Sequence, residues 1–374
     1  MKIIRAQFQQ FRNLEQVELV PSWGVNILLG RNAQGKTNVL EAMFAVAAGG
    51  SFRVSNERVL VQQGRDFARV ELDFENGRGD AKKAEVIWIL EDGFARKTVK
   101  LNGVVVQRSD VIRQMPVVLF SPEDIDLIRL SPQKRRKFLD LLITRFDMEY
   151  SQDLLDYWKV LRQRNQLLLM IKQGRSGEGE LEIWDEKMSE LGSRIVAKRQ
   201  KVAEEVSRLT NEYYHEWFGE LGDMLKISYA PSLNFTTPKI YGAGLAGARQ
   251  IDIARTNTTR GIHRDDVLLV LNGNDMRMSA SRGEFRSAVI ALKLAEGEIL
   301  KSKLGEAPVY LLDDIFSELD NNRKRRLVQA LVGAQVFVTA NNDKIGELFE
   351  RPEVLEVEQG RVEIRTGGKS LSGS

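Results

Sequence analysis

The 374-residue sequence contains no cysteine and only two histidines, His215 and His263. Without cysteine the chain can form neither a disulfide nor a cysteine-ligated zinc site, and a cytoplasmic protein is expected. With so few histidines, neither a histidine-based metal centre nor a Ser-His-Asp triad is expected. No apolar run reaches the ~18 residues that span a bilayer, so we expect no membrane partner.

The charged residues are nearly balanced in sign. Lysine and arginine number 55, and aspartate and glutamate 52, which gives a net charge of +3. This small excess permits a nucleic-acid partner, but any strongly basic surface must come from local clustering. The chain is long enough for two domains, or for one domain that carries a large insertion.

A glycine-rich stretch with the spacing G-x-x-x-x-G-K-T follows a short apolar run at 25–29 and precedes a helical pattern at 38–48. The stretch consists of Gly30, Arg31, Asn32, Ala33, Gln34, Gly35, Lys36 and Thr37. Between a strand and a helix, this spacing predicts a phosphate-binding loop, because its glycines let backbone N–H groups and the helix N-terminus face an anion. We expect Lys36 to neutralise the β- and γ-phosphates of ATP and Thr37 to offer its hydroxyl to Mg²⁺.

A second apolar strand pattern, 309–312, ends in two acids, Asp313 and Asp314. Beside a phosphate-binding loop, we expect Asp313 to hold Mg²⁺ through water and Asp314 to orient or deprotonate the attacking water. Ser281 and Gly283 stand just before a helical pattern at 287–304, where a helix N-terminus would form a second anion site. Two anion sites with one nucleotide loop make physical sense if they act in trans, so an ATP-dependent homodimer is predicted.

The secondary-structure patterns predict an α/β fold that is interrupted by helices. Alternating residues in 1–29 and 69–108, with Asp92-Gly93 and Asn102-Gly103 as hairpin turns, predict an antiparallel β-layer. From 151 to 222 the pattern is helical. We therefore expect one split domain, 1–122 with 224–374, and an inserted helical arm at 123–223 that contains a coiled-coil hairpin. The expected seam residues of this hairpin are Leu154, Trp158, Leu161, Leu168, Met188, Leu191, Ile195, Val202, Val206, Leu209 and Tyr213.

Three features each have two interpretations on local sequence alone. The helix start at 134–137, Lys-Arg-Arg-Lys, carries cations where the helix dipole disfavours them, so it either meets an external anion or forms a solvated face. If the anion is DNA, reversing the charge of Lys134 and Arg135 should weaken DNA binding. The basic run at 323–326 is a second candidate DNA surface or solvated face. His263 is either a catalytic base or, as we favour, a hydrogen-bonding or interface residue.

The order of these motifs, together with Ser317-Glu318-Leu319-Asp320, resembles the ATP-binding-cassette (ABC) heads of the SMC and Rad-type DNA-repair ATPases, and more narrowly the bacterial RecF family. The blocks that resemble RecF are, in order, Phe120-Ser121-Pro122-Glu123-Asp124, then Ser131-Pro132 with Arg135-Arg136 and Phe138-Leu139-Asp140, then Gly261-Ile262-His263-Arg264-Asp265-Asp266, and finally Ala291-Leu292-Lys293-Leu294-Ala295-Glu296. The resemblance implies an ABC-type P-loop ATPase head, with a mixed sheet and an antiparallel β-layer, that carries an inserted α-helical coiled-coil hairpin arm.

The resemblance also implies an activity and partners. RecF-like proteins would be slow DNA-dependent ATPases that convert ATP and water to ADP and phosphate. They would dimerise with ATP on double-stranded DNA near single-strand gaps and ss/ds junctions. RecR and RecO would be the partners, with RecA loaded downstream, in DNA replication, DNA repair and the SOS response.

Individual roles follow from matching positions. Lys36 and Thr37 keep the phosphate and Mg²⁺ roles, Asp313 the Mg²⁺ role and Asp314 the water-positioning role, while Ser281 and Gly283 become the signature that acts in trans and Asp320 a dimer-contacting loop residue. Ala33 departs from the family pattern, because many family loops carry glycine there, and Ile262 stands where proline is expected. The segment 336–341 has no histidine to sense the γ-phosphate, so Thr339 or Asn341 is expected to substitute, which is consistent with slow hydrolysis.

Two alternatives stay open at this point. The chain could be the head of another SMC-like ATPase, although an arm of about 100 residues gives helices of at most ~60 Å at ~1.5 Å per residue, and long-armed relatives need hundreds of residues. It could also be a nucleotide-gated scaffold that binds a protein partner without touching DNA. Binding to gapped duplex DNA at two salt concentrations distinguishes the scaffold from the DNA-binding ATPase.

Overall fold

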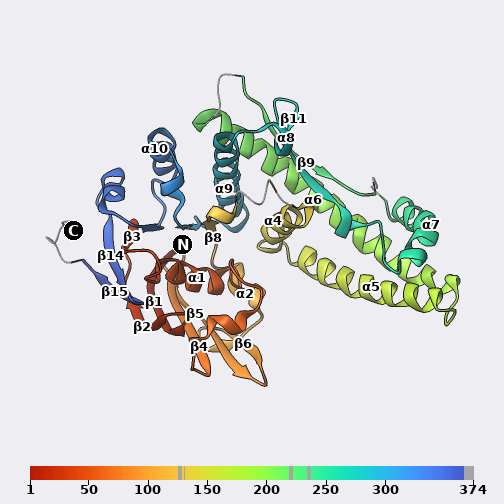
Figure 1. The fold of residues 1–374 in the computed structure, drawn as a ribbon, viewed down its shortest axis with the longest axis horizontal. Coiled ribbons are helices and arrows are strands. Elements are labelled where there is room, and N and C mark those ends of the chain that lie inside the picture. The colour runs from red at the N-terminus through yellow and green to blue at the C-terminus, as the bar shows by residue number, and fades with distance from the viewer. Residues whose placement is uncertain (125–128, 130, 219–221, 234–236, 366–374) are drawn as a thin grey trace. The chain divides into compact units, whose positions relative to one another are not determined.

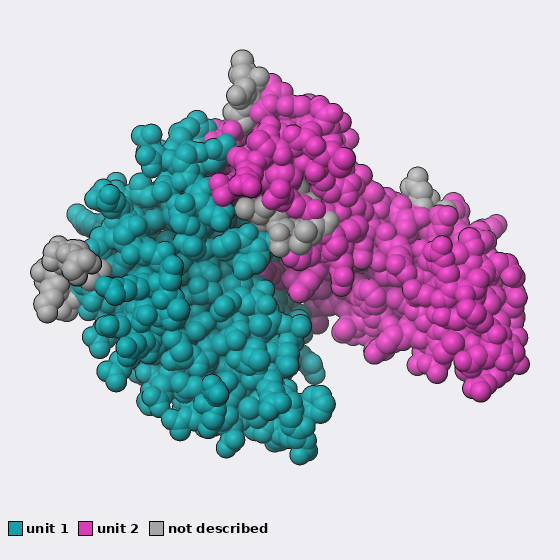
Figure 2. Space-filling model, viewed as in Figure 1, with its two compact units in different colours: residues 1–124, 293–374 teal, residues 125–292 magenta. Residues whose placement is uncertain are grey.

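The computed structural model describes residues 1–124, 129, 131–218, 222–233 and 237–365, shown as a ribbon in Figure 1. The chain forms two compact units, residues 1–124 with 293–374 and residues 125–292 (Figure 2). Both units combine helices with β-sheet, so the predicted α/β class is confirmed. Within the described ranges, no helix is both long and apolar enough to cross a membrane.

An antiparallel sheet in the first unit is the β-layer that the alternating sequence pattern predicts. Its strand order is β2-β1-β4-β5-β6-β7. The strands are β1 (Lys2–Phe11), β2 (Leu14–Leu19), β4 (Phe67–Glu75), β5 (Ala81–Glu91), β6 (Phe94–Leu101) and β7 (Val104–Val105). Asp92 and Gly93 have φ angles of 48° and 81°, and Asn102 and Gly103 have 51° and 80°. These paired left-handed residues form the tight turns that type I′ hairpins require.

The second sheet of this unit is mixed, as predicted, with the order β15-β14-β3-β13-β12-β8. Its strands are β3 (Val25–Leu29), β8 (Val117–Phe120), β12 (Val309–Leu312), β13 (Val336–Ala340), β14 (Glu353–Glu358) and β15 (Arg361–Ile364). Neighbours from β14 to β8 pair in parallel, and β15 pairs antiparallel with β14. Because parallel strands end at the same edge, β3, β13 and β12 bring the residues that follow them to one place.

Helix α1 (Lys36–Ala47) packs between these two sheets. Its core neighbours include Trp88 of β5 on one side and Phe337 of β13 on the other. A helix covered on two sides is apolar on most of its surface, and α1 follows that rule. The exception is Glu41, which is fully buried and accepts two hydrogen bonds from Arg12, at 2.8 and 3.0 Å. The helix that follows the glycine-rich loop is therefore fixed on both faces.

The second unit combines long helices with a three-stranded antiparallel sheet of order β11-β10-β9. Its elements are α4 (Pro132–Thr144), α5 (Met148–Lys172), α6 (Leu181–Trp217), β9 (Leu225–Ala230), α7 (Pro238–Arg255), β10 (Asp266–Leu271), β11 (Asn274–Asp275) and α8 (Met276–Ser279). Helix α9 (Arg282–Leu304) contains the unit boundary between residues 292 and 293. Helices α5 and α6 lie side by side and form the predicted helical hairpin (Figure 1).

The remaining elements are short helices and 3₁₀ turns. They are η1 (Glu57–Leu60), α2 (Arg108–Ile112), η2 (Pro122–Asp124), η3 (Glu178–Glu180), η4 (Ile262–Arg264), η5 (Ile315–Glu318), α10 (Asn321–Ala330) and η6 (Asp343–Leu348).

The division into units differs from the predicted domains at one of its two boundaries. The insertion was predicted at 123–223, whereas the second unit spans 125–292. Strand β9 pairs with β10 over its whole length, and both β9 and α7 pack against α6. These long-range contacts join the residues after 224 to the helices, and local periodicity cannot reveal them.

The buried seam of the helical hairpin contains charged side chains that the coiled-coil prediction did not include. The predicted seam residues that are buried are Leu161, Leu168, Met188, Ile195, Val202 and Val206, whereas Trp158 is 42% exposed. Helix α5 instead buries Arg164, which donates to Asp185 of α6 and to Asp252 of α7, each at 2.7 Å. A buried ion pair is invisible to a search for apolar stripes, because both partners have the sequence signature of surface residues.

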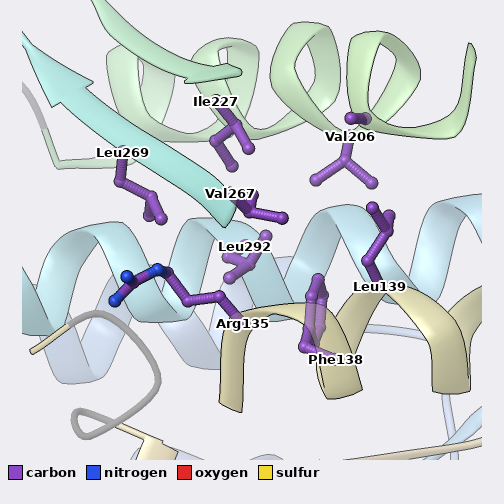
Figure 3. A pocket seen from close by; sticks show the side chains of 9 residues that line it. Arg135, Phe138, Leu139, Val206, Ile227, Val267, Leu269 and Leu292 are labelled. Carbon is purple, nitrogen blue, oxygen red and sulfur yellow. The ribbon is translucent and has the colours of Figure 1, made fainter. Parts of the chain in front are cut away.

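One cavity in the apolar interior of the second unit is very small. Figure 3 shows side chains from α4, α6, α9 and the strands β9 and β10 that converge on a cavity of about 10 Å³. The lining includes Leu139, Val206, Val267 and Leu292. A space of this size holds at most about one water molecule, so this cavity is a packing defect of the core and no ligand site.

Alanine substitutions at two glycines of the second unit are expected to change the stability of the protein in opposite directions. An added Cβ at Gly192 of α6 would lie 2.5 Å from the ring of Tyr241, which is fully buried, whereas one at Gly247 of α7 would meet nothing within 4 Å. We expect Gly192→Ala to destabilise the protein by about 1–3 kcal/mol through overpacking. Gly247→Ala should stabilise it by about 1 kcal/mol through helix propensity. Thermal and urea unfolding of both variants measures this, and a shift of the same sign in both would contradict the described packing of α7 on α6.

Candidate nucleotide-binding site

The glycine-rich loop joins β3 to α1, and two of its residues show why small side chains occur there. A Cβ at Gly30 would lie 2.2 Å from the carbonyl oxygen of Val357 in β14, so only glycine fits. Gly35 has a φ of +119°, and Ala33 has a φ of +64°. The Ala33 backbone is thus in the left-handed region, which costs a non-glycine residue about 1–2 kcal/mol. Glycine, which many family loops carry at this position, would adopt the same loop conformation without that cost.

Lys36 lies over the loop and is 8% exposed. Its Nζ donates to the carbonyl oxygens of Gly30 at 2.5 Å and Arg31 at 2.8 Å, and to Oδ1 of Asn341 at 2.7 Å. Burial lowers the pKa of Lys36, and the nearby carboxylates of Asp314 and Asp313 partly oppose that shift. The ammonium group is thus held beside the loop by oxygen atoms alone. The oxygen atoms of a bound phosphate would give it the same kind of environment.

Asp313, at the end of β12, accepts hydrogen bonds from two threonines. The hydroxyl of Thr37 donates to Asp313 Oδ1 at 2.9 Å, and that of Thr339 donates to the same oxygen at 3.0 Å. Burial raises the pKa of Asp313, and both threonine hydrogen bonds lower it in part. Thr37 and Asp313, 276 positions apart in sequence, therefore meet as the predicted metal-binding pair would have to.

The donor set of this pair fits Mg²⁺. Mg²⁺ commonly takes one or two protein oxygens and completes its shell with water and substrate phosphates. Thr37 and Asp313 provide a hydroxyl and a carboxylate oxygen in direct contact. In the described part of the chain no cluster of three or more His, Asp or Glu side chains could hold a metal by itself, so these two residues would supply only the protein's share.

Asp314 follows directly and is exposed. Its φ is 48°, and its backbone N–H donates to the hydroxyl of Thr339 at 2.8 Å. Thr339 thus contacts both acids, which fixes the direction in which the chain leaves β12. The segment 336–341 was expected to supply a substitute for the missing histidine, and the structure brings both candidates to the site, Thr339 on Asp313 and Asn341 on Lys36.

Two turns without a recognisable sequence motif also contact the loop. The side chain of Asn13, between β1 and β2, donates to the carbonyl oxygen of Gln34 at 3.0 Å. Between β14 and β15, the N–H of Gly360 donates to the same oxygen at 2.8 Å. A single asparagine and a Gln-Gly pair carry no local signal for a nucleotide site, because only the tertiary fold brings them to Gln34.

Ser281 and Gly283 lie at the N-terminus of α9, in the unit of residues 125–292, whereas the loop and both aspartates belong to the other unit. The N–H of Ser281 donates to Glu284 Oε2 at 2.6 Å, and the N–H of Glu284 donates to Ser281 Oγ at 3.2 Å. This reciprocal pair is a capping box, which satisfies helix-end N–H groups within the helix itself. Ser281 is exposed, and its placement as a residue acting in trans stays a prediction.

Asp320, predicted as a dimer-contacting residue, caps helix α10. Its carboxylate accepts from the backbone N–H groups of Asn322 at 3.0 Å and Arg323 at 2.9 Å, and it pairs with the Arg323 guanidinium. These interactions, the Arg323 N–H first among them, lower the pKa of Asp320. The capping role is structural and leaves the dimer contact as a prediction.

Two arginines at the basic start of α4, Arg135 and Arg136, have partners inside the protein. Arg135 is 1% exposed and donates to both carboxylate oxygens of Asp266, at 2.8 and 2.9 Å. Arg136 donates to the carbonyl oxygen of Asp265 at 2.5 Å. The prediction that Arg135 contacts DNA is therefore wrong. Its replacement by glutamate would place the new carboxylate beside that of Asp266. Lys134 and Lys137 are exposed and keep that hypothesis.

His263 has hydrogen-bond partners on both ring nitrogens. Nδ1 lies 3.1 Å from the hydroxyl of Tyr157, and Nε2 lies 2.9 Å from the carbonyl oxygen of Thr258. Burial lowers the pKa of His263 to about 4. A ring engaged on both sides and kept neutral suits the hydrogen-bonding interpretation better than the catalytic one.

This pKa predicts a stability effect with a definite sign. Histidine in an unfolded chain titrates near ~6.5, so between pH 6.5 and 4 the unfolded state takes up a proton that folded His263 does not. The protein should lose up to about 3 kcal/mol of unfolding free energy as the pH falls through this window, and His263→Gln should abolish that loss. The substitution His215→Gln, at an exposed position, is the control for the loss of one histidine. Parallel profiles for all three proteins would show that His263 is not held neutral.

A phosphate-binding loop between β3 and α1, faced by acids from β12 and backed by an antiparallel β-layer, defines the nucleotide-binding head of an ABC-type ATPase. Residues 2–363 match the family model described as the RecF/RecN/SMC N terminal domain. The chain belongs to the RecF family.

Individual relatives agree over nearly the whole length. The chain is 37% identical to a DNA replication and repair protein RecF from Acetivibrio thermocellus, over 96% of this chain and 99% of the relative. It is 33% identical to RecF from Geobacillus thermodenitrificans, over 94% and 96%. Among solved structures, the recombination mediator protein RecF with ATPrS in the RecFOR pathway superposes with a TM-score of 0.90 at 34% identity and 98% coverage of both chains. An Smc head domain from Pyrococcus furiosus shares the fold, with a TM-score of 0.56 at 18% identity, 97% coverage of this chain and 95% of that chain.

Proposed function

We propose that this protein is a DNA-binding ATPase of recombinational repair that uses ATP to dimerise on duplex DNA near single-strand gaps. The observation that carries the proposal is the hydrogen-bonded chain Thr37–Asp313–Thr339–Asp314 beside Lys36, which joins both halves of a nucleotide site. The ATP-bound structure of a RecF protein with a TM-score of 0.90 supports ATP as the ligand.

In this proposal the loop residues 30–37 bind the phosphates of ATP. Backbone N–H groups of the loop and the N-terminus of α1 face the anion, and Lys36 exchanges one or more of its oxygen partners for phosphate oxygens. Thr37 and Asp313 hold Mg²⁺, and the ion, when bound, neutralises charge on the β- and γ-phosphates. Asn341 then reports on the γ-phosphate, because its oxygen competes with the phosphate for Lys36.

Hydrolysis converts ATP and water to ADP and phosphate, and Asp314 is the residue that positions the water and accepts its proton. Its exposed carboxylate follows β12 directly, and Thr339 fixes its backbone. The absence of a histidine from 336–341 removes one group that could order the γ-phosphate, so slow, DNA-dependent turnover is expected.

The site is completed by a second copy of the chain. Ser281 and Gly283 present the N-terminus of α9 to the nucleotide held by the partner subunit, and Asp320 lies on the loop that meets that partner. ATP bound between two copies favours the dimer by mass action, and hydrolysis releases it. The lifetime of bound ATP thus sets how long two copies of the chain stay associated on DNA.

The DNA is double-stranded with ss/ds junctions, and Lys134 and Lys137 of α4 are candidate phosphate contacts. The RecFOR pathway named for the structural relative supports RecR and RecO as partners. Loading of RecA downstream is part of the same proposal. We propose the same role in DNA replication, DNA repair and the SOS response, which places the protein beside the chromosome in the cytoplasm.

The dimer mechanism is tested with Asp314→Asn. The substitution keeps the shape of the side chain but removes the group that takes the proton from water, so hydrolysis should fall about 10²–10⁴-fold. ATP should persist, and the variant should sediment as a dimer with ATP and Mg²⁺. Lys36→Ala is the control and should stay monomeric. A monomeric Asp314→Asn protein with bound ATP would refute ATP-driven dimerisation.

DNA binding at α4 is tested by fluorescence anisotropy with gapped duplex at two salt concentrations. Lys134→Glu with Lys137→Glu should weaken DNA binding and lower the salt slope by ~0.9 for each phosphate that is no longer neutralised, without changing ATP affinity. Lys201→Glu with Arg208→Glu, both exposed on α6, gives the same change in net charge. An equally weakened control would assign the effect to net charge alone. Absence of wild-type binding at low salt with ATP would favour the scaffold that does not touch DNA.

A further inference from the structure

We infer that two turns outside the glycine-rich motif clamp Gln34 and thereby set the direction of the Gly35 N–H. The turns are Asn13, between β1 and β2, and Gln359-Gly360, between β14 and β15. They are positioning residues, because they act through the loop and not on the nucleotide. ATP as the ligand of that loop rests on the proposed function.

Three hydrogen bonds hold Gln34. Its carbonyl oxygen accepts from Nδ2 of Asn13 at 3.0 Å and from the N–H of Gly360 at 2.8 Å. Its side-chain Oε1 accepts from the N–H of Gln359 at 2.7 Å. Both lone-pair directions of the carbonyl are thus engaged by groups from segments far away in sequence, and the side chain adds a third point of attachment.

The carbonyl of Gln34 and the N–H of Gly35 belong to the same peptide plane. The peptide bonds in the described residues are trans, and in a trans peptide the C=O and N–H bonds point in opposite directions. When Asn13 and Gly360 fix the carbonyl on one side, the Gly35 N–H must point to the other. Gly35, with a φ of +119°, has no side chain to resist a flip of this plane, so the restraint has to come from the clamp.

The clamp is itself held in place. Oδ1 of Asn13 accepts from Asn38 Nδ2 of α1 at 2.8 Å, and a Cβ on Gly360 would lie 2.0 Å from the carbonyl oxygen of Asn13, so the two turns touch. The neighbouring Arg12 binds Glu41, whose side chain is fully buried in α1. The turn that contains Asn13 therefore moves only if α1 moves.

Strand β14 also contacts β3, the strand that precedes the glycine-rich loop. It pairs in parallel with β3, with Glu356 opposite Leu29 at the end of β3. The hairpin of β14 and β15 therefore contacts both the strand that leads into the loop and the middle of the loop. A segment more than 300 positions from Lys36 is thereby part of the machinery that shapes the phosphate site.

A matched pair of glycine substitutions tests this inference. Gly360 and Gly103 are both the second residue of a hairpin turn with a φ of +80°, but a Cβ at Gly103 meets nothing within 4 Å. Gly360→Ala and Gly103→Ala therefore carry the same left-handed strain, and only Gly360→Ala pushes the two turns apart. By isothermal titration calorimetry with ATP and Mg²⁺, we expect Gly360→Ala to weaken binding at least tenfold and Gly103→Ala to change it less than twofold. Equal affinities in the two variants would overturn the clamp.

A second readout needs no nucleotide. Hydrogen exchange of the peptide that covers residues 30–38 should be faster in Gly360→Ala and in Asn13→Ala than in the wild type, and unchanged in Gly103→Ala. Asn13→Ala keeps the test decisive if Gly360→Ala does not fold. If the wild type failed to bind ATP, the proposed function would fall while exchange in the loop still decided on the clamp. Unchanged exchange in Asn13→Ala would overturn it.

Discussion

Three parallel strands, β3, β13 and β12, end together at one edge of the mixed sheet, and the whole site depends on that pairing. Each strand end delivers a different chemical group. The loop with Lys36 follows β3, Thr339 lies near the end of β13, and Asp313 follows β12. The hydroxyl of Thr339 then links the acids to one another, so sheet register, and not local sequence, sets the distances within the site.

The parts of this site that consist of short sequence motifs could be predicted from local sequence. The loop at 30–37 and the acids at 313–314 were predictable because each stands beside an apolar strand pattern. The turns at Asp92-Gly93 and Asn102-Gly103 were predictable because left-handed backbone needs those residue types. Asn13 and Gly360 were not, because their contribution is a contact with Gln34 across the fold. The second unit extends beyond the predicted arm for the same reason, since β9 pairs with β10 and packs on α6.

Some charged residues of the second unit are buried, although the sequence suggests that they lie at the surface. Arg135 and Arg164 look like surface cations, yet both are buried and paired with aspartates. A buried arginine without its carboxylate costs several kcal/mol, so such pairs penalise every arrangement of helices that separates them. Part of the apparent surplus of charge on α4 is thus neutralised inside the protein by Asp266. Lys134 and Lys137 of the same helix are exposed, and their contact with an external anion stays a prediction.

The split of the first unit also has a consequence for how the chain is made. Strand β3 ends at residue 29, but its two sheet neighbours, β13 and β14, begin at residues 336 and 353. At ~5–20 residues per second, a ribosome needs roughly 15–60 s to synthesise the stretch between them. During that interval both edges of β3 lack their final partners, while residues 125–292, which form the second compact unit, are synthesised. Nascent β3 therefore has two unpaired apolar edges until the last tenth of the chain emerges.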